Sequence, residues 1–250
     1  MTNKAAKGGK SSLVAIVAGT KAETVMEILH KIPEKLRKKV SEITLDMAAN
    51  MALIAKKCFP QATQVTDRFH VQQLALEAVQ DMRIKYRLEA LDAENQALEE
   101  AKLNQRLYEP EVLANGETVK QLLARSRYVL YKKVTDWTTS QQERATLLFE
   151  RYPDLKRAYE LSQGLSYIFE NTTDKLYGLA RLAKWHEKAR QAGFKAFNTV
   201  ARSIQNHYQT ILNYFDNHST NASAESFNAK IKAFRSQFRG IVTLNSSSTG

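Results

Sequence analysis

The apolar positions of the first 70 residues form short continuous runs separated by stripes with helical spacing. The first run, residues 11–19 (SSLVAIVAG), is rich in Leu, Val, Ile and Ala and predicts a buried strand. Residues 2–10 (TNKAAKGGK) contain a Gly-Gly pair and predict the turn of a hairpin that leads into it. Thr20 and Glu23 then have the spacing of a capping box, so we expect a helix capped by Thr20.

Two further short strands are predicted downstream, and both end on an aspartate. Residues 42–46 (EITLD) and 63–67 (TQVTD) contain β-branched residues, while residues 51–59 between them have helical spacing and are stopped by Pro60. A strand–helix–strand order with short connections is typical of parallel α/β topology. We therefore predict a parallel sheet in this part of the chain.

The stretch from residue 71 to residue 218 is patterned almost entirely as helix. Its apolar positions predict helices over residues 71–108, 119–134, 141–152, 155–170, 174–191 and 196–215. Trp137 and Trp185 fall in this stretch, and a buried anchor of a helical bundle is the first interpretation for each. Residues 89–117 contain eight acids and two bases, which predicts a solvated helix face.

The last stretch begins with a polar turn and continues as one amphipathic helix over residues 222–234. Glu225, Asn228 and Lys232 share the polar face of that helix. The tail after it has no pattern and is expected to fray. The sequence therefore predicts a division into residues 1–70, 71–218 and 219–250.

Composition narrows the class of partner. The chain has 37 Lys and Arg against 26 Asp and Glu, which gives a net charge of +11. This charge excludes an acidic disordered protein and favours a polyanionic binding partner such as nucleic acid. Nine Gly and four Pro are too few for a sandwich or barrel of many short strands. No apolar run approaches the ~20 residues of a membrane-spanning helix, so we expect a cytoplasmic protein with no membrane partner. Cys58, the single cysteine, is predicted to be a small buried hydrophobe.

Three carboxylates have positions that suit metal-dependent chemistry. Asp46 and Asp67 each end a predicted strand, where parallel sheets place ligand sites, and Glu225 lies near the start of the last helix. Hard cations such as Mg²⁺ take oxygen ligands, and two such ions can clamp both the attacking and the leaving oxygen of a phosphodiester. An aspartate at a strand end is also a common helix N-cap. Spacing alone leaves both interpretations open.

Three motifs in order resemble the catalytic domain of bacterial insertion-sequence transposases of the DDE superfamily. They are DM at residues 46–47, DRFHV at residues 67–71 and AESFNAKIK at residues 224–232. Together they resemble the ISL3 group, over residues 2–240. The resemblance implies an α/β fold in which an incomplete RNase H-like sheet is interrupted by a large all-α insertion domain, residues 71–218.

The resemblance also implies metal-dependent cleavage and transfer of DNA strands, with two Mg²⁺ or Mn²⁺ ions. DNA (element ends and target) would be the partner of a homodimer or higher oligomer associated with the bacterial nucleoid. Asp46 and Glu225 match the catalytic, metal-binding carboxylates. Asp67 and His70 match a D-x-x-H element with an auxiliary, structural role; a metal-ligand role for His70 is the alternative. DNA contacts are expected from Asn228, Lys230, Lys232, Arg235, Arg239, Trp185 and Trp137.

The sequence departs from the family pattern at its start. The first Asp of the triad belongs on a strand ahead of the hairpin that residues 2–10 match, and none of the acids before residue 46 fits that place. A two-ion site without one bridging carboxylate binds Mg²⁺ poorly. We therefore expect an N-terminally truncated copy with an incomplete triad and little activity. The alternative is a non-catalytic, basic DNA-binding fragment or remnant.

Overall fold

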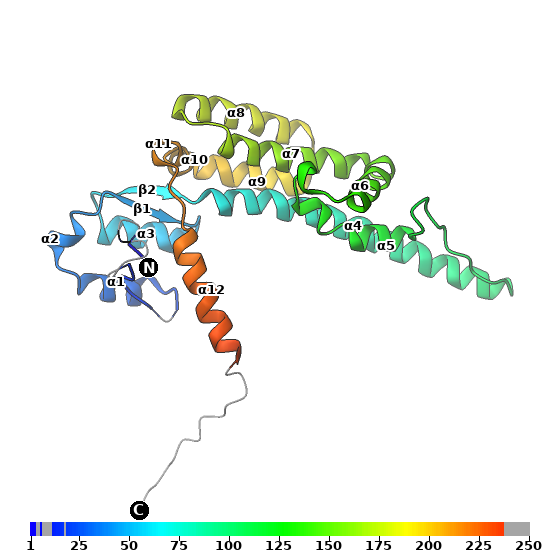
Figure 1. Cartoon of the computed structure of the whole chain (residues 1–250), viewed down its shortest axis with the longest axis horizontal. Helices are drawn as coiled ribbons and strands as arrows, with labels where there is room; N and C mark the ends of the chain where they lie inside the picture. The colour runs from blue at the N-terminus through cyan, green and yellow to red at the C-terminus, as the bar shows by residue number, and fades with distance from the viewer. Residues whose placement is uncertain (4–5, 7–11, 18, 238–250) are drawn as a thin grey trace, which may run out of the picture. The chain divides into compact units, whose positions relative to one another are not determined.

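The computed structural model divides the chain into two compact units (Figure 1). Unit 1 comprises Met1–Gln64 with Ser219–Gly250, and unit 2 comprises Val65–His218. The structure describes residues 1–3, 6, 12–17 and 19–237, without the side chains of residues 223, 234, 235 and 237. The sequence placed the inner boundaries at residues 71 and 218, so unit 2 begins six residues earlier than the predicted helical stretch.

Unit 1 contains a small parallel sheet and the helices around it. Strands β1 and β2 pair in parallel, as predicted from the strand–helix–strand pattern. Helices α1 and α3 pack through a core cluster of Val25, Leu29, Ile54 and Cys58, and Cys58 is fully buried, as predicted. The elements are α1 (Ala22–His30), α2 (Glu34–Arg37), β1 (Glu42–Leu45), α3 (Ala49–Cys58) and α12 (Ala222–Gln237), together with β2 (Thr63–Thr66), whose last two residues are counted in unit 2. Among the described residues, the named strands form this two-stranded sheet and not the larger sheet of an RNase H-like fold.

Two predictions for the first 21 residues are wrong. The run expected as a buried strand forms a single antiparallel bridge, from Leu13 to Thr2, and Val14 and Ile16 are 44% and 60% exposed. An apolar run forms a buried strand only where neighbouring elements cover it, and none of the described residues of this run is fully buried. Helix α1 is also not capped by Thr20, because its N-cap is Lys21, which makes no side-chain capping bond.

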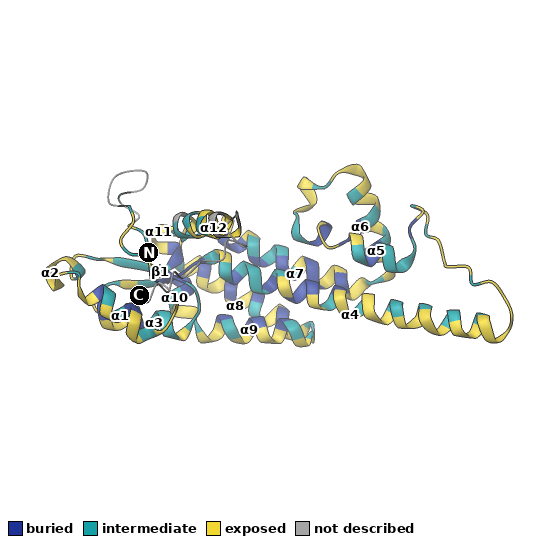
Figure 2. Ribbon diagram, turned by 90° about the horizontal axis from the view of Figure 1, so that it is seen from below, coloured by how far each residue is buried: buried dark blue, intermediate teal, exposed yellow. Residues whose placement is uncertain are grey.

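Unit 2 is a helical bundle built on one long helix. Helix α4 packs against α7 and α9, and α8 packs against the same two helices from the other side, which closes a ring of four (Figure 1). Figure 2 shows that the buried positions of α7 and α8 lie on their inward faces. The bounds are α4 (Arg68–Leu103), α5 (Val119–Arg125), α6 (Thr139–Arg151), α7 (Pro153–Glu170), α8 (Lys175–Gln191), α9 (Lys195–Asn206), α10 (Tyr208–Leu212) and α11 (Tyr214–Asn217).

Two of the predicted helices are shorter or broken. The pattern over residues 119–134 becomes α5 followed by two 3-10 turns, η2 (Val129–Tyr131) and η3 (Val134–Asp136). The pattern over residues 196–215 becomes three consecutive helices, α9 to α11. In both places the apolar residues keep helical spacing while the backbone bends, so periodicity gave the buried face but not the continuity of the helix.

Close packing at Gly178 gives a testable difference between two helical glycines. A Cβ atom at Gly178 would lie 2.7 Å from the ring of Phe215, which is itself stacked on Phe169 and cannot yield freely. We expect Gly178→Ala to lower the free energy of unfolding by about 1–3 kcal/mol. A Cβ atom at Gly164 would lie 3.8 Å from its nearest neighbour, a ring atom of Trp185, which is an ordinary contact. Gly164→Ala should therefore raise the free energy of unfolding by about 0.5–1 kcal/mol. Urea unfolding of both variants measures this, and equal effects would contradict it.

Candidate functional site

Asp46 directly follows β1 and is half-buried. Its Oδ1 accepts a hydrogen bond from the Ala48 backbone N–H at 3.0 Å, and no further bond to this carboxylate forms among the described residues. The N-cap of α3 is Ala48, so the N-cap interpretation of Asp46 is wrong. The turn therefore fixes one carboxylate oxygen of Asp46 and leaves the other available to a ligand.

Asp67, which follows β2, has a different role. It is 1% exposed and is the N-cap of α4, where its side chain accepts a hydrogen bond from the Phe69 backbone N–H at 3.0 Å. The N-cap interpretation is thus confirmed for this aspartate. Capping satisfies one of the orphan N–H groups at the start of a 36-residue helix.

The capping role predicts how two substitutions at Asp67 differ. Ala removes the capping acceptor, so Asp67→Ala should lower the free energy of unfolding by about 1–2 kcal/mol. Asn caps a helix about as well as Asp, so Asp67→Asn should change the free energy of unfolding by only a few tenths of a kcal/mol. Urea denaturation of the two variants is the measurement. Equal destabilisation by both would show that the negative charge, and not the cap, is what the fold uses.

The rest of the DRFHV motif packs within unit 2. Arg68 stacks over the ring of Tyr214 at 5.8 Å, and burial raises the pKa of the Tyr214 hydroxyl. His70 is half-buried with its ring edge-on to Phe69, at 5.9 Å between centroids. These contacts give the motif a packing role at the start of α4.

Glu225 lies in the first turn of α12 and is half-buried. Asn228 and Lys232 follow it at helical spacing, and both side chains are exposed, as is that of Lys230. The side chain of Arg235 and the whole of Arg239 lie outside the described residues. The polar face predicted for this helix is therefore present from Glu225 to Lys232.

The two candidate carboxylates are of the type that binds a divalent cation, but two are too few to form a complete site. Asp46 and Glu225, both in unit 1, offer the oxygen donors that Mg²⁺ and Mn²⁺ prefer. Across the part of the chain that the structure describes, no group of three or more His, Cys, Asp or Glu side chains could hold a metal ion. The two residues would thus be part of a ligand set, and the described residues do not complete it.

Both tryptophans pack against other residues of unit 2. Trp185 is 4% exposed, and its Nε1–H donates to the Leu161 carbonyl at 2.8 Å. Trp137 is half-buried, stacks on Tyr159 and donates to the Val129 carbonyl at 2.9 Å. At 4% exposure Trp185 has little surface for a DNA contact, while the half-buried Trp137 keeps part of its surface exposed.

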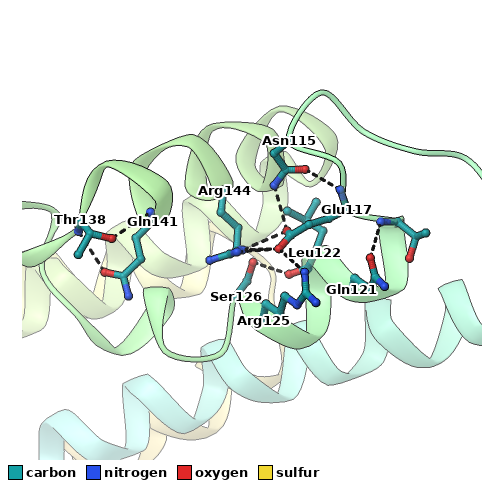
Figure 3. Close-up of polar contacts among 10 residues, drawn as sticks. Asn115, Glu117, Gln121, Leu122, Arg125, Ser126, Thr138, Gln141 and Arg144 are labelled. Atoms are coloured by element: carbon teal, nitrogen blue, oxygen red, sulfur yellow. Dashed lines mark hydrogen bonds and ion pairs between the residues drawn. The ribbon is translucent and has the colours of Figure 1, made fainter.

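A buried ion cluster in unit 2 was not predicted. Glu117, at the end of the acidic stretch taken for a solvated face, is 3% exposed. Figure 3 shows the polar contacts around it. Arg144 binds its carboxylate through Nε and Nη2, the latter at 2.6 Å, while Arg125 and Asn115 each donate at 3.0 Å. The hydrogen bonds from Arg144 are the main reason that the pKa of Glu117 falls to about 2. Glu117 thereby joins the start of α5 to α6.

Two other acids of this stretch also pair with bases that follow it. Glu94 binds Lys120 at 2.8 Å, and Glu111 binds Arg151 through both of its oxygens. A partial signal existed in the sequence, since the acids of residues 89–117 precede a segment rich in Lys and Arg. Which acid would be buried could not be read from that signal, because it depends on the loop before α5.

Comparison with known proteins identifies the family. The sequence model of a transposase family, the ISL3 group of DDE transposases, matches residues 1–247, and the chain belongs to that family. It is 27% identical over 194 residues to the transposase for insertion sequence element IS1557 in two strains of Mycobacterium tuberculosis. Those residues are 77% of this chain and 43% of the relatives, so the match spans less than half of their length. No solved structure matches the chain.

None of the described helices is both long and apolar enough to cross a lipid bilayer.

Proposed function

We propose that this chain belongs to the catalytic domain of a DDE transposase, which cleaves and joins DNA strands in a metal-dependent reaction during transposition. The observation that carries the proposal is the family match over residues 1–247 together with the position of Asp46 at the end of a parallel strand. Asp46 also has a carboxylate oxygen that accepts no hydrogen bond from the described residues. This combination favours a ligand role for Asp46, whereas Asp67 is 1% exposed and caps α4.

In this proposal Asp46 and Glu225 are the residues of the chain that would hold Mg²⁺ or Mn²⁺, two ions in the intact family. When bound, such ions polarise the phosphodiester and lower the pKa of an attacking water. Asn228 and Lys232, on the same face of α12 as Glu225, would bind the scissile phosphate: the amide by hydrogen bonding, the ammonium by charge. Lys230, Arg235 and Arg239 would add phosphate contacts along this basic segment.

The remaining assignments follow from the same family. Unit 2 would be the helical insertion in an RNase H-like core to which β1, β2 and α12 belong. Asp67 and His70 would organise the start of that insertion rather than take part in the chemistry. The partner would be DNA, bound by a homodimer or higher oligomer. Because this DNA is chromosomal, the protein would be found at the nucleoid in the bacterial cytoplasm.

A nicking assay separates this proposal from the rival, a basic protein that binds DNA without cutting it. Supercoiled DNA carrying the ends of an insertion element is incubated with the chain in Mn²⁺, in Mg²⁺ or in a chelator. The transposase proposal predicts slow nicking that requires the metal and disappears in Asp46→Asn. Salt-sensitive binding with no nicking by the wild type would favour the rival and overturn the catalytic assignment.

A further inference from the structure

Unit 2 contains a buried arginine that forms no ion pair with a carboxylate in the part of the chain that the structure describes. Arg83, on the face of α4 that packs against α5, is 5% exposed. Its Nε donates to the Gln80 side-chain oxygen at 2.7 Å, and its Nη1 donates to the Leu123 carbonyl at 2.9 Å. Both acceptors are neutral, whereas buried charges in proteins are normally paired with an opposite charge. The positive charge of Arg83 is oriented by these bonds but remains uncompensated.

Two exposed arginines flank this buried charge. Arg87 is one helical turn beyond Arg83, at i+4 on the same face of α4. Arg127 follows α5, and its backbone carbonyl accepts a hydrogen bond at 3.2 Å from Gln80, the residue that also orients Arg83. Neither guanidinium forms an ion pair within the described residues. The next carboxylate on this face, Glu94, lies seven residues beyond Arg87 and is occupied by Lys120.

The local charge is therefore strongly positive. Burial lowers the pKa of the Arg83 guanidinium, and the charges of Arg87 and Arg127 lower it further, as expected where like charges meet. Elsewhere in unit 2, Arg144, Arg125 and Arg151 all bind glutamates. The cluster Arg83–Arg87–Arg127 thus differs from these three arginines in having no acid partner among the described residues, and Arg83 differs further in being buried.

We propose that Arg87 and Arg127, above the buried Arg83, form a phosphate-binding site for the DNA backbone on unit 2. The proposal rests on the transposase function, which supplies DNA as the partner. A phosphate between the two exposed guanidiniums would receive charge-assisted hydrogen bonds from both and offset the buried charge below. Tyr128, 66% exposed with Arg127 over its ring at 5.8 Å, lies beside the site and can pack on a sugar or base.

The test compares two double variants with equal loss of charge. Arg87→Gln/Arg127→Gln removes the proposed contacts, and Lys184→Gln/Lys188→Gln removes two exposed bases of α8 that form no ion pair in the described chain. Affinity for a fluorescently labelled DNA duplex of mixed sequence is measured as a function of salt. We expect the arginine variant to bind about tenfold more weakly and to lose about 2 from the slope of log K against log salt, while the lysine variant changes much less.

Equal weakening by both double variants would mean that only net charge matters and would overturn the site. Unchanged binding by the arginine variant, with a wild type that binds DNA, would also overturn it while leaving the transposase proposal intact. A wild type with no affinity for DNA would contradict both. Inorganic phosphate provides a further arm: if it raises the melting temperature of the wild type only, and the arginine variant keeps its DNA affinity, the site takes free phosphate and not DNA.

Discussion

Glu117→Gln should lower the free energy of unfolding at neutral pH by about 3 kcal/mol, because it removes the only carboxylate that Arg144 and Arg125 bind among the described residues. Gln keeps the size of the side chain but leaves Arg144, whose side chain is 18% exposed, with a charge and no counter-charge. Denaturation by urea, followed by circular dichroism, measures the change.

The same carboxylate predicts how stability depends on pH. Its pKa is near 4.5 ordinarily and about 2 in the folded protein, so the folded state holds its proton less tightly than the unfolded state. Its contribution, ~3 kcal/mol, is complete above pH 4.5 and is lost as the pH falls from 4.5 towards 2. Glu117→Gln should therefore flatten the stability profile in this window, while leaving its shape above pH 5 unchanged.

Glu111→Gln is the matched control for this prediction. Glu111 also binds an arginine through two hydrogen bonds, but its side chain is 56% exposed, and exposed pairs contribute about 0–1 kcal/mol. If the two variants lost equal stability, burial of the Glu117 cluster would not be the source of the effect.

Loss of metal affinity is the second large expected effect. Asp46→Asn and Glu225→Gln each remove the charge of one proposed ligand without changing its size, and each should lower the affinity for Mn²⁺ by at least ~100-fold. The signal of free Mn²⁺ in electron paramagnetic resonance follows binding without any need for turnover. Glu187→Gln, an exposed carboxylate on α8, is the control and should bind as the wild type does.

If the wild type binds Mn²⁺ and both variants bind it with the same affinity, Asp46 and Glu225 are not ligands. The same conclusion would follow if Glu187→Gln reduced the affinity to the same extent, because binding would then reflect the general charge of the surface.

The sequence predicted most of the elements near the candidate site and fewer of its details. Strands over residues 42–45 and 63–66 and the helix of residues 222–237 were expected close to their observed bounds, because alternation, proline and polar turns are local signals. The run at residues 11–19 failed for a different reason. Its burial depends on neighbouring strands, which local apolar spacing does not report.

The two strand-end aspartates show where local patterns stop being informative. Asp46 and Asp67 occur in the same context, a short strand followed by a helix, yet Asp67 caps its helix and Asp46 does not. The difference lies in the register of each helix start, one residue after Asp67 and three residues after Asp46. Likewise, Arg83 and Glu117 are ordinary charged residues in the sequence, and only the packing of α4, α5 and α6 makes them buried.

The two aspartates also provide the most direct test of the catalytic assignment. The nicking rate on DNA carrying element ends is measured in Mn²⁺ for the wild type, Asp46→Asn and Asp67→Asn under identical conditions. Asp46→Asn should abolish the metal-dependent rate, while Asp67→Asn, which keeps the helix cap, should retain most of it. The opposite order, or metal-dependent nicking that survives in Asp46→Asn, would contradict the assignment of Asp46 as a catalytic carboxylate.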